Sequence, residues 1–328
     1  MNEIISIKDL KVYFDVKSGF IKDFLSKEKK KVKAVDGLSL DIYKGEIVSL
    51  VGESGSGKTT VGKAILKLVE KTDGKILFEG KEIDKKNKKD IKEFRQRAQM
   101  IFQDPYQSLN PKNIISDIVS EPLEVNGLIS SIKDRDKKVV EALEWAGLTP
   151  ASEYLSRYPH ELSGGQRQRV AIAGSMILNP EFIIADEPVS MLDVSVRSGI
   201  LKLMLDLKEE KGVSYLFITH DLSLAWAISD RVAIMYLGKI LELGDANLII
   251  GACCHPYTKA LVSVMPLPKV DKDKKRIILK GETPNPANIP LGCRFHPRCP
   301  IAQNICRKEE PSLKEIADNH FVACHFPS

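Results

Sequence analysis

Apolar residues along the chain follow two different periods, and their order predicts an α/β fold. Segments 4–14 and 32–42 alternate apolar and polar positions, as half-buried antiparallel strands do. Compact apolar runs that predict further strands lie at 47–51, 76–78, 98–102, 182–185, 215–219 and 231–236. Helical spacing occupies 60–68, 137–145, 166–177, 194–207 and 222–228. Strand, helix and strand in succession indicate a parallel sheet with right-handed crossovers.

The same pattern divides the chain into regions. Between 104 and 178 it is mainly helical, which predicts a helical subdomain within a larger domain spanning 1–245. After Asp245, Pro, Cys and His residues accumulate and the periodicity weakens, so we expect a small irregular C-terminal extension at 246–328. Segment 18–31 is expected to be a surface insertion between two strands of an antiparallel β subdomain.

The turn between the strand at 47–51 and the following helix has the spacing of a P-loop, G-x-x-x-x-G-K-[ST]. Glycines let the backbone wrap around phosphates, and the helix N-terminus faces the anion. We expect Lys58 to reach the β- and γ-phosphates and Thr59 to hold Mg²⁺. The predicted nucleotide-binding residues of this turn are Gly52, Glu53, Ser54, Gly55, Ser56, Gly57, Lys58, Thr59 and Thr60.

Two carboxylates follow the apolar run at 182–185. They are Asp186 and Glu187, and the C-terminal edge of a parallel sheet is where nucleotides bind in open α/β folds. Asp186 is expected to belong to the Mg²⁺ shell, and Glu187 to act as general base toward the attacking water. The alternative, a simple turn at the strand end before Pro188, becomes a minor one beside the P-loop.

A second glycine-rich helix start lies at 162–166. Ser163 is a good N-cap, and Gly164, Gly165 and Gln166 open the predicted helix, which makes a second anion site. One nucleotide does not need two such cradles from one chain. We therefore expect two chains to meet, each giving this second cradle to the nucleotide of the other.

Composition excludes several other classes of protein. Hydrophobic residues make up 43% and charged residues 28%, which is ordinary for a soluble chain. No apolar run is long enough to span a bilayer, and no secretory signal is visible, so a cytosolic location or attachment to the cytosolic face of a membrane is expected. The net charge of +5 comes largely from lysine clusters at 27–33 and 85–89. Without aromatics or arginines these clusters favour solvated loops over nucleic-acid binding, and a role facing lipid headgroups stays open.

Taken together, the motifs resemble those of ABC-transporter ATPase subunits. The matching features are the P-loop at 52–59, Gln103 in the run Phe-Gln-Asp-Pro, the signature at 162–166, the pair Asp186 and Glu187, and His220. The resemblance covers about residues 4–245 and implies a P-loop ABC ATPase core with a mixed sheet.

That resemblance implies further roles for single residues. Gln103 would sense the γ-phosphate and Mg²⁺, and His220 would contact the γ-phosphate. Asp193 would lie at the dimer interface, although the Met residue two positions before it departs from the usual Ser-Ala-Leu-Asp motif. Either Tyr13 or Phe14 would stack on adenine, because strand alternation lets only one of them face the base.

The flanking sequences resemble the dipeptide and oligopeptide importer branch, in its DppF/OppF-type subunit. They are FQDPYQSLNP at 102–111, PVSMLDVSVR at 188–197 and HPYT followed by AL at 255–261. This implies a peripheral subunit on the cytoplasmic face of the membrane that works with a DppD/OppD-type sister ATPase, two permease subunits and an extracytoplasmic peptide-binding protein. A nickel importer remains the close alternative; a soluble ABC ATPase or an exporter motor is a more distant one.

Four of the six cysteines fall late in the chain. Cys293, Cys299, Cys306 and Cys324 are separated by gaps of five, six and seventeen residues, wider than the C-x₂₋₄-C pairs of structural zinc. Such gaps favour a larger cluster, and the resemblance to the importer branch implies a four-iron–four-sulfur cluster here. Zinc remains one alternative, since His296, His320 and His325 are available as substitute ligands, and free buried cysteines without a metal are another.

Overall fold

The computed structural model describes residues 2–15, 31–83, 87–266 and 276–328. The predicted surface insertion at 18–31 lies outside these residues except for its last position, and each lysine cluster lies partly outside them. The chain divides into two compact units. The first unit consists of residues 1–4, 42–46 and 81–217, and the second of residues 5–41, 47–80 and 218–328.

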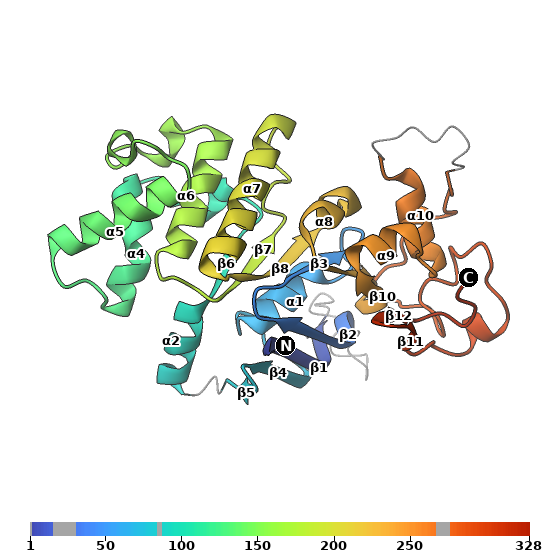
Figure 1. Ribbon diagram of the computed structural model, residues 1–328. Helices are drawn as coiled ribbons and strands as arrows, with labels where there is room; N and C mark the ends of the chain where they lie inside the picture. The colour runs from blue at the N-terminus through green and yellow to red at the C-terminus, as the bar shows by residue number, and fades with distance from the viewer. Residues whose placement is uncertain (1, 16–30, 84–86, 267–275) are drawn as a thin grey trace, which may run out of the picture. The chain divides into compact units, whose positions relative to one another are not determined.

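The first unit contains most of the helices. Two parallel strands, β6 (Ala98–Ile101) and β7 (Phe182–Asp186), pair with Ala98 opposite Phe182. Helices α4, α5 and α6 pack against one another, and in Figure 1 they lie together in green. The helices of this unit are α2 (Lys88–Arg97), α3 (Pro105–Ser108), α4 (Ile115–Asn126), α5 (Ile132–Trp145), α6 (Gly164–Met176), α7 (Val194–Lys211), and the short η1 (Ala151–Glu153) and η2 (Pro159–Glu161). Strand β5 (Lys81–Glu82) also begins here.

The second unit holds most of the antiparallel strands. Most of β1 (Glu3–Asp15) and β2 (Lys31–Tyr43) belongs to it, and β1 pairs antiparallel with β4 (Asp73–Phe78). A second sheet orders its strands as β11 (Lys314–Ala317), β12 (His320–Val322), β10 (Lys239–Asp245), β9 (Arg231–Tyr236) and β3 (Ile47–Val51). β3 and β9 are parallel, and the remaining pairs are antiparallel.

Short helices surround the strands of the second unit. They are α1 (Lys58–Ile65), α8 (Leu222–Ile228), α9 (Ala246–Gly251), α10 (Pro256–Val264) and the short η3 (Ile305–Arg307). Strand β8 (Ser214–Thr219) contains the boundary between the two units. No helix within the described ranges is both long and apolar enough to cross a bilayer.

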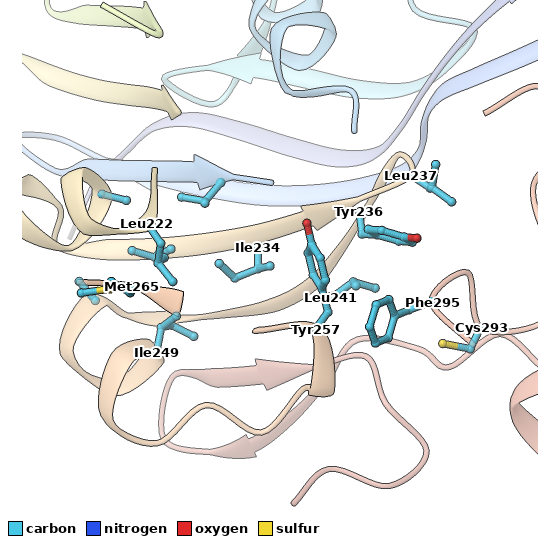
Figure 2. Close-up of a cluster of buried hydrophobic side chains, with 14 of the residues drawn as sticks. Leu222, Ile234, Tyr236, Leu237, Leu241, Ile249, Tyr257, Met265, Cys293 and Phe295 are labelled. Atoms are coloured by element: carbon cyan, nitrogen blue, oxygen red, sulfur yellow. The ribbon is translucent and has the colours of Figure 1, made fainter. Parts of the chain in front are cut away.

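The hydrophobic core of the second unit joins its sheet to the C-terminal residues. Figure 2 shows Ile234, Tyr236 and Leu241 from the strands together with Tyr257 and Phe295 from the later part of the chain. Tyr236, Tyr257 and Phe295 are each 0% exposed. The residues after Asp245 therefore share one core with β9 and β10, which gives them a rigid base.

The sequence predicted most of these elements. The apolar run at 47–51 is β3, the helical run at 222–228 is α8, and the run at 231–236 is β9. The α/β fold class is confirmed. The pattern did not anticipate β10, β11 and β12, by which the C-terminal residues add strands to the sheet.

Candidate nucleotide-binding site

The P-loop lies between β3 and α1, as its spacing predicts. All five residues of β3 are buried, and α1 begins at Lys58. Gly57 has a φ of 107°, and a Cβ there would overlap the carbonyl oxygen of Ala34. A Cβ at Gly52 would overlap the carbonyl oxygen of Met235. Both positions therefore require glycine, because the loop passes directly against neighbouring backbone.

The Lys58 ammonium is held inside this loop. The residue is only 6% exposed, and its Nζ donates to the carbonyl oxygens of Gly52 at 2.8 Å and Glu53 at 3.0 Å. A longer contact of 3.4 Å reaches the hydroxyl of Ser56. A buried cation at the start of a helix attracts an anion. Thr59 and Thr60 are half-buried at the helix start, and Ser54 and Gly55 are exposed on the loop.

The two aromatic residues near the end of β1 have different surroundings. The Tyr13 hydroxyl donates to Asp36, and burial together with that hydrogen bond raises the pKa of Tyr13 to about 12. Phe14 is 42% exposed. The polar end of Tyr13 is thus occupied, whereas the Phe14 ring is available to stack on a planar ligand.

His220 is exposed directly after β8 ends at Thr219. Its neighbour Asp221 caps α8, accepting the N–H groups of Ser223 at 2.8 Å and Leu224 at 3.3 Å. This cap fixes the backbone that carries the histidine, since it satisfies two N–H groups that the helix cannot pair itself.

In the first unit, the structure brings Gln103 and Glu187 together. The Gln103 amide Nε2 donates to Glu187 Oε2 at 3.2 Å. Asp186, at the end of β7, is 4% exposed. Glu187 has a φ of 47°, which is uncommon for a residue other than glycine, and such strain occurs most often at functional positions.

The second glycine-rich segment forms a capped helix start in the same unit. The Ser163 hydroxyl accepts the Gln166 N–H at 3.3 Å, and the Gln166 side chain accepts the Ser163 N–H at 2.9 Å. This reciprocal capping box fixes the first turn of α6. A Cβ at Gly165 would clash with Val196, and Gly164 lies against Leu192.

Asp193 occupies the N-cap position of α7, but its side chain makes no capping hydrogen bond and is exposed. An acidic side chain left outside the cap is available to a second chain. Gln103, Ser163, Glu187 and Asp193 thus belong to the first unit, whereas the P-loop, Phe14 and His220 belong to the second.

Sequence reasoning missed residues of the C-terminal extension that contact the P-loop. Arg298 Nη1 donates to both carboxylate oxygens of Glu53, at 3.0 and 2.9 Å, and the Tyr257 hydroxyl accepts the Glu53 N–H at 3.2 Å. No periodicity signals a pair that is 245 positions apart in sequence. The one available hint was a pair of arginines four residues apart, Arg294 and Arg298.

Comparison with known proteins identifies the class. A family model described as ABC transporter matches residues 35–190, and one described as the C-terminal region of oligopeptide/dipeptide transporters matches residues 241–306. Among solved structures, cbiO1 of Clostridium perfringens has a TM-score of 0.64 and 26% identity, covering 77% of this chain and 92% of that one. The ATP-binding cassette MJ0796, solved with ADP and phosphate, has a TM-score of 0.64 and 28% identity, covering 74% and 98%. The fold and the phosphate loop are thus those of an ATP-binding cassette ATPase.

Curated relatives narrow that class. The oligopeptide transport ATP-binding protein AppF of Bacillus subtilis strain 168 is 46% identical, over 99% of this chain and 98% of that protein. The putative oligopeptide transport ATP-binding protein YkfD of the same strain is 45% identical, over 98% and 95%. The chain belongs to the ABC transporter family, in the group of oligopeptide transport ATP-binding proteins. The resemblance stated from the motifs is confirmed, and the chain is an ATP-binding and ATP-hydrolysing protein.

The predicted iron–sulfur cluster is wrong. The matched families and relatives are described as ABC transport proteins, with nothing that indicates a cluster. Cys293, Cys299, Cys306 and Cys324 do line one cavity, but its volume is about 10 Å³, the room needed for a single water molecule.

Burial also sets the protonation state of these thiols. Burial raises the pKa of Cys293 to about 11 and raises the pKa values of Cys299 and Cys324, so these thiols are protonated at neutral pH. Cys293 and Cys306 pack as small apolar side chains in the hydrophobic core, and Cys299 packs against it. Figure 2 shows Cys293 in this core.

The alternative of zinc at these four cysteines gains no support either. In the described part of the chain, the group that brings three ligand atoms within 4.8 Å of one another consists of Glu242, Cys254 and His320. Of the predicted substitute ligands it includes only His320. Glu242 already accepts hydrogen bonds there from the Cys254 N–H at 2.7 Å and the His255 N–H at 3.1 Å, and its Oε1 lies 2.8 Å from His320 Nε2.

Proposed function

We propose that this chain is one of two ATPase subunits that power the import of peptides. The observation that supports this cargo most strongly is the match of residues 241–306 to the C-terminal region of oligopeptide/dipeptide transporters, together with 46% identity to AppF along nearly the whole chain. Residues 1–245 would form the nucleotide-binding domain, with a helical subdomain at about 104–178. Residues 246–328 would form the importer-specific extension.

Each predicted residue would have a defined part in ATP hydrolysis. Lys58 would exchange its loop carbonyls for phosphate oxygens, and Phe14 would stack on adenine. Glu187 would accept a proton from the attacking water, and the hydrogen bond from Gln103 would orient the Glu187 carboxylate. His220 would contact the γ-phosphate.

The residues present fit a magnesium ion. Thr59, Gln103 and Asp186 offer the hydroxyl, amide and carboxylate oxygens that Mg²⁺ prefers, and Asp186 is almost fully buried. Bound there, Mg²⁺ would neutralise charge on the β- and γ-phosphates.

A second cassette would complete the site. Ser163, Gly164, Gly165 and Gln166 of one chain would face the P-loop of the other, with Asp193 at the interface. Ser163 is exposed at the start of α6, and the capping box fixes the first turn of that helix, which supports this role. The partner cassette would be a non-identical sister, and both would bind two permease subunits at the cytoplasmic face of the membrane.

Co-purification tests the assignment. A tagged chain, extracted in mild detergent from its native membranes, is expected to bring with it a second ATPase and two polytopic membrane proteins, with an extracytoplasmic peptide-binding protein encoded alongside. If the purified complex is a nickel importer, a transport assay would instead show uptake of nickel and no uptake of peptides. Isolation of the chain with ribosomes or DNA and without membrane proteins would contradict the proposal.

A further inference from the structure

The C-terminal extension holds the second position of the P-loop, Glu53, by both its side chain and its backbone. The Arg298 guanidinium donates to the two carboxylate oxygens at 3.0 and 2.9 Å, and the Thr283 hydroxyl donates to the same carboxylate. The Tyr257 hydroxyl accepts the backbone N–H of Glu53 at 3.2 Å. All these residues belong to the second unit.

The groups that hold Glu53 are themselves fixed by packing. The ring centres of Tyr236 and Tyr257 lie 4.9 Å apart, and those of Tyr257 and Phe295 lie 5.3 Å apart. Figure 2 shows the three rings together. The Arg298 side chain is 10% exposed, and its guanidinium lies 5.9 Å from the centre of the Tyr236 ring. A guanidinium packed in this way loses little further freedom when it binds a carboxylate.

The contact with Glu53 also bears on Lys58. The Glu53 carbonyl oxygen accepts from Lys58 Nζ at 3.0 Å, while the N–H of the same residue is bound by Tyr257. Both flanking peptide groups of Glu53 are therefore oriented. The position of the ammonium that would meet the phosphates depends on that orientation.

A second arginine of the C-terminal extension, Arg294, contacts Asp36, which is the hydrogen-bond partner of Tyr13. Arg294 is 4% exposed and donates to Asp36 and to the carbonyl oxygen of Leu237. Asp36 also accepts the hydroxyl of Tyr13, the neighbour of Phe14. Burial opposes the ionisation of Asp36, but these hydrogen bonds outweigh it and lower its pKa. The segment that carries Arg294 and Arg298 thus contacts the P-loop at Glu53 and strand β2 at Asp36, close to the residues expected to bind adenine.

We propose that Arg298 is a positioning residue for ATP binding: it neutralises and orients Glu53, so that the extension sets the affinity of the P-loop for ATP. The inference rests on ATP binding at this loop and not on the cargo. Removing Arg298 would leave a carboxylate without its cation inside a loop that must accept a polyanion. Repulsion between like charges would then weaken ATP binding.

The full-length chain is titrated with a fluorescent ATP analogue in the presence of Mg²⁺. Arg298→Ala is expected to raise the Kd for the nucleotide about tenfold, a size typical of close charge pairs. Adding Glu53→Gln to that variant is expected to restore most of the affinity, because the unpaired charge disappears. Arg307→Ala, which removes an exposed arginine of the same extension, should leave the Kd unchanged.

The rescue separates positioning from a merely structural role. If Arg298→Ala weakens binding and Glu53→Gln restores nothing, or if folded Arg298→Ala binds with the wild-type Kd, the proposal is overturned. Should Arg298→Ala fail to fold, Arg298→Lys keeps the charge without the planar guanidinium, and its expected Kd is within about threefold of wild type. A tenfold or larger loss in folded Arg298→Lys would contradict the role assigned to charge.

Discussion

At the scale of single residues, the structure separates two neighbouring aromatic side chains that the sequence could not. Tyr13 is tied to Asp36 through its hydroxyl, whereas Phe14 is 42% exposed. Strand alternation predicts that only one of the two faces the base but does not say which. The hydrogen bond favours Phe14 as the residue that stacks on adenine.

Replacing Phe14 tests that choice. Phe14→Ala is expected to raise the Kd for ATP about tenfold, since stacking on a base contributes about 1–3 kcal/mol. Tyr13→Phe removes only the hydroxyl and should change the Kd little. Fluorescent-nucleotide titration measures both, and a wild-type Kd for Phe14→Ala would contradict the stacking role of Phe14.

The close backbone approach at Gly57 can also be tested by a single substitution. Gly57→Ala combines a φ of 107° with overlap against the Ala34 carbonyl, so the loop must shift and ATP binding should fall by more than about tenfold. Gly80→Ala is the matched control, because Gly80 also has a positive φ, 77°, but nothing lies within 4 Å of its added Cβ. Equal nucleotide affinities in the two variants would show that close backbone approach at Gly57 is unimportant.

At the scale of elements, helix α10 links the extension to the core through a buried histidine. The His255 Nδ1 accepts the Tyr257 N–H at 3.0 Å and so caps the helix, and the residue is 1% exposed. Burial lowers the pKa of His255 to about 3, so the imidazole stays neutral in the folded protein. The unfolded chain has the ordinary histidine value, near 6.5.

This difference predicts how stability depends on pH. At and above pH 7, His255 is neutral in both states and imposes no penalty. As the pH falls from about 6.5 toward 3, the unfolded state binds one more proton, and the free energy of unfolding decreases by about 1.4 kcal/mol per pH unit. His255→Asn keeps a capping side chain but cannot titrate in this range.

Urea unfolding at pH 7 and pH 5 measures the effect. Between these values the wild-type protein is expected to lose about 2 kcal/mol more stability than His255→Asn, because about 1.5 pH units lie below the unfolded pKa. Parallel losses in both proteins would mean that His255 does not titrate as its burial implies.

Sequence reading succeeded for elements whose signal is local. The P-loop turn before α1 and the Ser163 N-cap of α6 each depend on residues that are close in sequence, and the structure has both where they were predicted. It did not reveal how the extension folds back, because the contact between Arg298 and Glu53 spans 245 positions. The cysteine spacing was misleading for a physical reason: four thiols can line one small cavity as packing groups alone.

At the scale of the whole molecule, the residues proposed to bind and hydrolyse ATP belong to both compact units. The P-loop belongs to the second unit, and Gln103, Asp186 and Glu187 belong to the first. The exposed signature at Ser163 would act on the nucleotide of a sister chain. Hydrolysis would therefore depend on assembly, which suits a motor that must coordinate with membrane subunits.

The most direct test of this account is ATP-driven peptide uptake by the complete transporter in proteoliposomes, with Glu187→Gln in place of the wild-type chain. The account predicts that the variant still binds ATP with an affinity near wild type, while ATP turnover falls by about 10²–10⁴-fold, the range expected for loss of a general base, and peptide uptake stops. Wild-type uptake and turnover with Glu187→Gln would contradict it.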